Sequence, residues 1–288
     1  MSYNAVYAIC IMWLDGVIWL PLILLALERI LAGRGAGPFV VALALCFVST
    51  WYISYMIGIF CALYLCARLY VLRPKGRELG RIAARFFGGA ACALGLTAWL
   101  WLPTFLSMFN GKFSGGNVDY PGLLACTPLD ILSQLRPGQY RSIASGSAVY
   151  LFCGSAALVL AAAYFLLPRF SRREKLANGG LLAVLAASLL LSPLDKAWHL
   201  FQRPNWFPFR YSFVVSFTLL YLAAPALGQL LKGLRRRKGE GLTRAAAGAL
   251  VCLTVMELGL NTLGILSGLM GQFGCDSYAA YRAYYADN

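Results

Sequence analysis

The chain has 288 residues, of which 60% are hydrophobic and only 12% are charged, and its mean hydropathy is +0.68. Because an average soluble domain is about a quarter charged, this composition excludes an ordinary soluble protein. The 25 Lys and Arg against 11 Asp and Glu give a net charge of +14. In a soluble protein this charge would suggest a nucleic-acid partner, but the apolar content argues against one. We therefore expect a polytopic α-helical membrane protein.

Apolar runs separated by charged or Pro/Gly clusters predict a transmembrane helical domain over residues 1–271. Taken in chain order, about eight spans are expected, at residues 8–27, 38–50, 54–71, 84–107, 148–167, 178–194, 211–231 and 245–268. The second run is short, and with the third it could form one long broken element. Two long loops, 109–147 and 195–211, separate the later spans, and residues 272–288 are expected to open a truncated extracytoplasmic segment.

The basic residues orient these spans. With eight spans, alternate loops hold 18 of the 25 Lys and Arg, and the positive-inside rule makes those loops cytoplasmic. A seven-span count would place neighbouring basic clusters on opposite faces. We therefore expect eight spans, with loops 109–147 and 195–211 and both termini outside. The first residues show no signal-peptide pattern, so the chain is expected to start midway through a longer architecture.

Cysteine and histidine counts limit metal chemistry. The nine Cys form no C-x-x-C pair and mostly lie within apolar runs, so neither a zinc site nor a disulfide framework is expected. The only histidine is His199, which excludes a multi-histidine centre. Cys126 and Cys275 both fall in predicted outside segments and could pair.

The loop 195–211 carries the main candidate site. It combines aromatic residues with His199, Asn205, Arg210 and Tyr211. An arginine guanidinium can donate two parallel hydrogen bonds to phosphate oxygens, and aromatic rings can lie against both the lipid chains and the headgroups. This loop could therefore bind a phosphate-linked lipid. The alternative is an ordinary interfacial belt with snorkelling cations.

Asp15 is the second candidate, because apolar residues flank it on both sides. A carboxylate within a span is costly unless it faces a polar cavity, which makes it a functional candidate. The alternative places Asp15 at the outer interface as the cap of a helix that starts at residue 16.

Three segments of the chain resemble a known family. The stretch Ile11-Met-Trp-Leu-Asp to Glu28-Arg29 resembles the "MWLD…LPL…ER" segment of bacterial YfhO-type membrane proteins, and Asn205-Trp-Phe-Pro-Phe-Arg-Tyr-Ser-Phe resembles their "NWFPYRYSF" segment. Trp51-Tyr-Ile-Ser-Tyr-Met is similar to a third, "NFYIGYM", with Trp51 in place of Asn and Ser54 in place of Gly. The resemblance covers nearly the whole chain, although the family's N-terminal spans and C-terminal region are expected to be missing.

The resemblance implies a GT-C-like bundle in the bacterial cytoplasmic membrane. It also implies a glycosyltransferase that moves a sugar from a polyprenyl-phosphate carrier to an extracytoplasmic cell-envelope polymer such as teichoic acid. In that class an acidic residue of the first outside loop serves as base or as ligand of a possible divalent metal. That loop would lie upstream of Met1, and no metal ligand is identifiable in this sequence, so the piece could be inactive as a fragment.

Within this interpretation Arg210 is expected to bind the phosphate of the lipid-linked sugar donor, with Asn205, His199 and Tyr211 as weaker candidates. No catalytic residue is assigned, and Asp15 is left between a structural cap and a supporting role. The expected partners are membrane lipids, the sugar donor and the polymer acceptor. The alternatives are a lipid or polysaccharide flippase or transporter and a non-catalytic membrane scaffold.

Overall fold

The computed structural model describes residues 2–111, 122–135, 149–202, 204, 207–235, 248, 251–253, 255 and 259. These residues form helices joined by short connections, which confirms the predicted all-α membrane fold. The helices are α1 (Ser2–Val6), α2 (Ile11–Leu31), α3 (Gly37–Leu72), α4 (Arg77–Leu96), α5 (Ala98–Gly111), α6 (Pro128–Ser133), α7 (Ser155–Leu166), α8 (Arg172–Leu190), α9 (Ser192–Trp198) and α10 (Ser212–Arg235), with a 3₁₀ turn at Tyr7–Ile9.

Among the described helices, α2, α3, α4 and α10 are long and apolar enough to cross a membrane, and α7 is a shorter apolar helix. Most of the expected last span, 245–268, and all of residues 272–288 lie outside the described residues. The count of eight spans therefore stays a prediction.

Helix α2 shows how apolar sequence is divided between the protein core and the membrane. Its buried side chains recur every three or four residues, at Leu20, Ile23, Leu27 and Ile30. The other side of the helix exposes Ile11, Ile18, Leu22 and Leu25. Both sides are apolar, as expected of a helix that packs on neighbours along one stripe and contacts lipid along the rest.

Helix α3 folds back on itself at Thr50, whose φ of −158° and ψ of 83° are not helical. The Ser54 hydroxyl lies 2.9 Å from the Cys46 sulfur, whereas residues eight apart along a straight helix are separated by about 12 Å. The second half of α3 runs parallel to α2, because Gly16 packs on Ile53 and Glu28 is bonded to Arg68. The first half therefore runs antiparallel to α2, and α3 crosses the molecule twice.

The expected span 84–107 is divided between α4 and α5. The chain breaks at Thr97, whose hydroxyl donates to the Ala93 carbonyl at 2.8 Å and whose φ of −107° and ψ of 6° leave the helical range. Helix α4 begins at Arg77 rather than near residue 84. The expected span was defined by apolar residues alone, whereas the helix also includes the polar turns that precede them.

Helix α8 also begins before the apolar run that predicted it. The expected span was 178–194, but the helix starts at Arg172 behind an N-cap at Ser171. The Ser171 hydroxyl accepts from the Glu174 N–H, and the Glu174 carboxylate accepts from the Ser171 N–H. This capping box satisfies two N–H groups of the first turn and sets the start of the helix.

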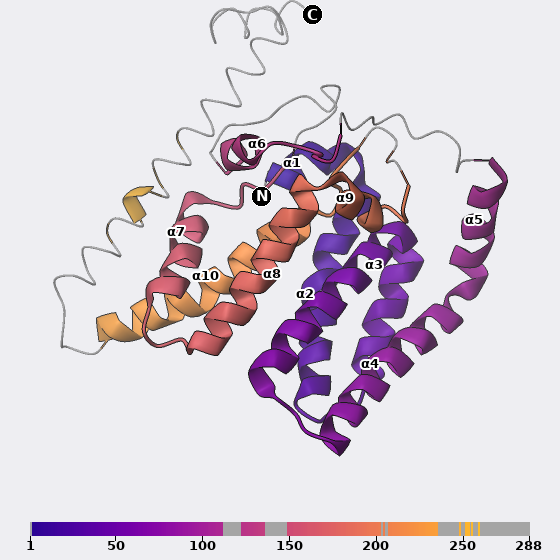
Figure 1. Cartoon of the computed structure of the whole chain (residues 1–288), viewed down its shortest axis with the longest axis horizontal. Coiled ribbons are helices and arrows are strands. Elements are labelled where there is room, and N and C mark those ends of the chain that lie inside the picture. Colours follow the sequence, from indigo (N-terminus) through magenta and orange to yellow (C-terminus); the bar gives the residue numbers. More distant parts are fainter. Residues whose placement is uncertain are drawn as a thin grey trace, which may run out of the picture.

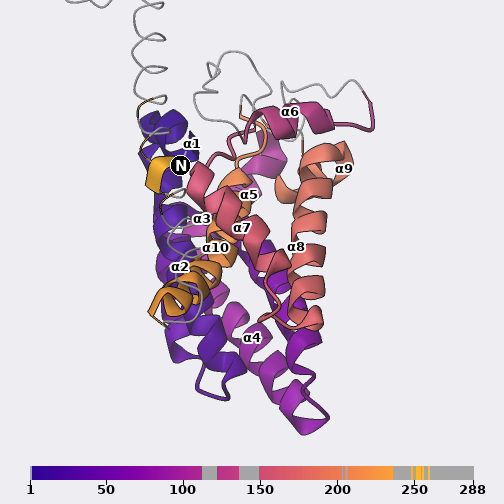
Figure 2. The same ribbon diagram turned by 90° about the vertical axis from the view of Figure 1, so that its left-hand side faces the viewer.

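The connections gather at two ends of the bundle (Figure 1). Helices α1, α6 and α9 lie at one end, here called the α9 end, and the α3–α4 and α7–α8 connections lie at the other, here called the basic end. Figure 2 shows the same division from the side. The basic end contains Arg73, Lys75 and Arg169, so the positive-inside rule predicts that it is cytoplasmic.

The described part of loop 109–147 is fixed to the α8–α9 junction. The Ala125 N–H donates to the Leu190 carbonyl at 2.7 Å, and the Ser192 N–H donates to the Leu123 carbonyl at 2.9 Å. The Cys126 thiol is buried and donates to the Leu189 carbonyl at 3.1 Å, and burial raises its pKa to about 11. Cys275 lies outside the described residues, so its pairing with Cys126 stays a prediction.

Candidate functional site

Arg210 lies at the α9 end, two residues before α10 begins. Its guanidinium carbon is 4.8 Å from the ring centre of Trp13, 5.3 Å from that of Tyr52 and 5.7 Å from that of Phe207. Its Nε donates to the Phe207 carbonyl at 3.0 Å, and the side chain is half-buried. Each cation–π contact contributes about 0.5–2 kcal/mol, depending on how far it is removed from water. Aromatic stacking uses the faces of the guanidinium, while its N–H donors lie in the plane at its edge.

This aromatic cage joins three segments that are far apart in the sequence. Trp13 is in the first turn of α2, and Tyr52 lies two residues after the fold in α3. Phe207 belongs to the loop that leads into α10. These are the three segments that carry the family resemblance, and the structure brings them together around one cation.

The loop before α10 holds Arg210 through strained backbone. Leu200, Phe201 and Phe209 have φ values of 58°, 59° and 58°, in the left-handed region that residues other than glycine rarely adopt. Each such residue costs on the order of 1–3 kcal/mol, and strain of this kind concentrates at functional sites. Phe209 comes directly before Arg210 and is buried, so packing fixes the direction in which Arg210 leaves the chain.

Tyr211 is completely buried behind Arg210. Its hydroxyl donates to the Ser188 carbonyl of α8 at 2.8 Å. Its ring stacks on Trp198 with the centres 4.5 Å apart and the planes 11° apart. The structure thus gives Tyr211 a packing role at the junction of α8, α9 and α10.

His199 is also buried, with 1% of its surface exposed. Its Nδ1 lies 2.8 Å from the Asp195 carbonyl oxygen and 3.5 Å from the Asp195 carboxylate. Since a carbonyl only accepts, Nδ1 carries the proton, and the buried Nε2 has no hydrogen-bond partner among the described residues. Burial lowers the pKa of His199, while the Asp195 charge opposes that shift, so the ring is neutral at pH 7.

The N-terminal residues support the same loop from another side. The Tyr7 hydroxyl donates to the Pro208 carbonyl at 3.5 Å, and the Tyr7 ring packs edge-on to Phe207 with the centres 6.1 Å apart. Residues 2–7 precede the first expected span, which starts at residue 8. Their aromatic side chains carry no motif, so their place beneath the Arg210 loop was not predicted.

The other predicted site residues are placed as follows. Asn205 lies outside the described residues. Asp15 is half-buried in the second turn of α2, and because that helix starts at Ile11, the suggestion that Asp15 caps a helix from residue 16 is wrong. The prediction did not include Trp13, Tyr52 and Phe207 as site residues. Their signal was present, because each lies within one of the three segments that resemble the family.

An apolar groove of about 390 Å³ lies beside the cage, between α3, α4 and α5. It begins at the α9 end with Trp51, Tyr55 and Leu200 and continues past Gly58 and Leu94. Tyr55 fixes this edge, since its hydroxyl donates to the Ala197 carbonyl of α9 at 2.8 Å. The ring of Trp51, which lines the groove, packs edge-on to the cage residue Tyr52 with the centres 5.7 Å apart, so the groove opens next to the cage.

Metal ligands do not gather in the described part of the chain. Within those residues, no three His, Cys, Asp or Glu side chains come close enough to hold a metal ion. The divalent metal that the resemblance implies therefore has no fitting site among them, and no step is assigned to it.

The family described as "Bacterial membrane protein YfhO" matches residues 1–262 of the chain. No curated protein and no solved structure matches.

Proposed function

Because the chain belongs to the YfhO family of bacterial membrane proteins, we propose that it takes part in sugar transfer at the outer face of the cytoplasmic membrane. The donor would be a sugar on a polyprenyl-phosphate carrier, and the acceptor a cell-envelope polymer such as teichoic acid. The observation that carries this proposal is the cage around Arg210, where all three family-like segments meet.

The chemistry of the donor accounts for this site. In glycosyl transfer the acceptor hydroxyl attacks the anomeric carbon, and the bond from that carbon to the phosphate oxygen breaks. The departing phosphate takes the electron pair, and a preorganised cation stabilises this charge. We assign that role to Arg210, whose guanidinium is oriented by three aromatic rings and by its bond to Phe207.

The neighbouring groove suits the hydrocarbon part of the carrier. Its lining is apolar, it is open along the membrane-crossing part of α3, and it starts beside the cage. A carrier with its phosphate at Arg210 would place its first isoprene units between Trp51 and Tyr55. Asp15, in the second turn of α2, is assigned a supporting role. The acceptor proton needs a base, which the resemblance implies is an acidic residue of an outside loop.

The direct test replaces Arg210 in the protein within its native membrane. Arg210→Ala should lower sugar transfer from the polyprenyl-phosphate donor at least about 100-fold, the range seen for loss of one transition-state donor. Arg210→Lys keeps the positive charge but loses the planar guanidinium, so its rate of sugar transfer should lie between those of the unaltered protein and Arg210→Ala. Transfer is measured in membrane vesicles, and abundance by immunoblot.

The matched control is Arg85→Ala at the basic end. Arg85 is also half-buried and also donates to a carbonyl, that of Gly33 at 2.7 Å, but it lies far from the cage. It should leave transfer unchanged. Normal transfer by Arg210→Ala would contradict the role given to Arg210, and sugar-independent lipid movement would favour a transporter.

A further inference from the structure

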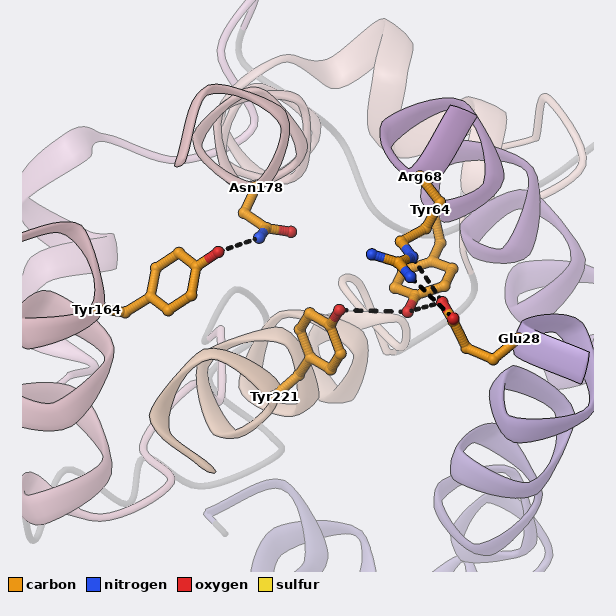
Figure 3. A network of polar contacts seen from close by, with 6 residues as sticks. All are labelled: Glu28, Tyr64, Arg68, Tyr164, Asn178 and Tyr221. Atoms are coloured by element: carbon orange, nitrogen blue, oxygen red, sulfur yellow. Dashed lines mark hydrogen bonds and ion pairs between the residues drawn. The ribbon is translucent and has the colours of Figure 1, made fainter. Parts of the chain in front are cut away.

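A second polar site lies at the basic end, away from the cage, and Figure 3 shows its side chains. The Glu28 carboxylate accepts from Arg68 Nε at 2.7 Å, from Arg68 Nη2 at 2.9 Å and from the Tyr64 hydroxyl at 2.7 Å. Tyr64 has one proton, which Glu28 accepts, so the 3.3 Å contact between Tyr64 and Tyr221 is a bond that the Tyr221 hydroxyl donates. Arg68 Nη1 and the Tyr221 oxygen remain for another partner.

A second pair faces this network from α7 and α8. Asn178 Nδ2 donates to the Tyr164 oxygen at 2.8 Å, which leaves the Tyr164 proton and the Asn178 carbonyl oxygen for other bonds. In Figure 3 this pair lies opposite the Arg68 network. A cavity of about 130 Å³ separates them, and the residues of the two networks that line it are Arg68, Tyr164, Asn178 and Tyr221.

The cavity also contains one negative group, Glu174. The Glu174 Oε2 caps α8 by accepting from the Ser171 N–H at 2.8 Å, which leaves Oε1 available. The lining thus carries one cation, Arg68, and one anion, Glu174, with two tyrosine hydroxyls and an amide. It is a mixed donor and acceptor site, in which Arg68 also carries the ion pair with Glu28.

An apolar groove of about 400 Å³ continues from this cavity between α3 and α8. The two spaces share Ala67 and Ala177 as lining residues. The groove walls reach the membrane-facing surface, since Leu176 is 63% exposed and Val184 43% exposed. Gly180 widens the groove, because nothing lies within 4 Å of the position that its Cβ would occupy.

We propose that the cavity and the groove together bind one phospholipid with an ethanolamine headgroup, taken from the leaflet at the basic end. The ester-linked chain lies in the groove between α3 and α8, and the headgroup lies in the adjoining cavity, which shares Ala67 and Ala177 with the groove. A polar cavity joined to an apolar groove fits an amphiphile, whereas a neighbouring apolar helix would fill the groove alone.

The charges of the lining select the headgroup. The phosphate accepts from Arg68 Nη1 and from the Tyr164 hydroxyl, and the ammonium donates to Glu174 Oε1, the Asn178 carbonyl and the Tyr221 oxygen. A choline head has the same charges but no N–H to donate. A glycerol head has no cation to pair with Glu174.

The test uses the full chain in phosphatidylcholine vesicles that contain a trace of photoactivatable lipid. Three probes carry the same diazirine-labelled chain on an ethanolamine, a choline or a glycerol headgroup. Labelled peptides are mapped by mass spectrometry. The ethanolamine probe should label residues 63–70 and 176–184 at least about threefold more than either other probe.

Two variants separate the chain groove from the headgroup cavity. Gly180→Leu fills the groove and should reduce labelling by the ethanolamine probe to the level of the choline probe. Gly88→Leu, an exposed glycine of α4 with equally open surroundings, is the control and should change nothing. Glu174→Gln keeps the capping box but removes the charge, so it should abolish the ethanolamine preference. Glu78→Gln, in the first turn of α4, is its control.

Three results would overturn the proposal. These are equal labelling by all three probes, stronger labelling by the glycerol probe, and labelling that Gly180→Leu leaves unchanged. If Gly180→Leu does not accumulate, the comparison of probes on the unaltered chain and on Glu174→Gln still decides the question.

Discussion

At the scale of single residues, the cage makes Arg210 a fixed cation instead of a flexible one. Three rings and one carbonyl restrict a side chain that otherwise loses up to about 2 kcal/mol of rotamer entropy when it binds a ligand. Interfacial snorkelling, the alternative considered for this loop, leaves a cation mobile in the headgroup layer. The contacts of Arg210 support the binding role proposed for it.

The cage predicts a graded effect of removing one ring. Trp13→Leu keeps an apolar side chain but removes the shortest of the three described cation–π contacts, so Arg210 should be less well oriented and sugar transfer should fall about tenfold. Trp19→Leu is the matched control, because Trp19 is a half-buried tryptophan of the same helix and is not one of the three described rings around Arg210. Transfer assays on both variants check this. Equal losses would show that tryptophan packing in α2, and not the cage, is responsible.

His199 predicts a pH dependence of stability. Burial lowers its pKa below the usual value of 6.5, so the unfolded chain binds a proton that the folded chain rejects. The contribution of neutral His199 to the free energy of unfolding is complete above the pKa of histidine in the unfolded chain. It is lost as the pH falls below that value. In detergent, the unfolding temperature should drop between about pH 7.5 and pH 5.5, and His199→Gln should flatten that slope. Since His199 is the only histidine, an unchanged slope in His199→Gln would contradict the assignment.

At the scale of elements, the fold in α3 depends on a close approach to α2. A Cβ added at Gly16 would collide with Cγ2 of Ile53. Glycine is thus required where the start of α2 meets the second half of α3, which is also where Trp13 and Tyr52 enter the cage.

This approach predicts opposite effects at two glycines. Gly16→Ala should destabilise the protein by about 1–3 kcal/mol through overpacking, and it should lower transfer by separating Trp13 from Tyr52. Gly58→Ala, in α3 with open surroundings, should leave stability unchanged or raise it slightly. Unfolding in mild denaturant compares the two. A stable Gly16→Ala protein would show that α2 and α3 are less tightly packed than described.

At the scale of the whole molecule, the sequence predicted the all-α membrane fold and the family, because composition and three motif segments carry both. It could not predict that Trp13, Tyr52 and Arg210 meet, since contacts across such separations depend on how α2, α3 and α10 pack. It named Tyr211 as a weaker candidate ligand and could not predict that Tyr211 is buried, because a motif does not show which side of the loop faces the core. The start of α8 was missed since hydropathy ignores the Ser171–Glu174 capping box.

Direct binding of the donor phosphate tests the central claim, which is that the Trp13–Tyr52–Phe207 cage presents Arg210 to a lipid-linked phosphate. Phosphorus NMR of a polyprenyl-phosphate sugar is recorded with the unaltered protein, with Arg210→Ala and with Arg85→Ala, all in the same detergent. A shifted and broadened phosphorus signal is expected with the unaltered protein and with Arg85→Ala, and an unshifted signal with Arg210→Ala. The same shift with Arg210→Ala would contradict the account.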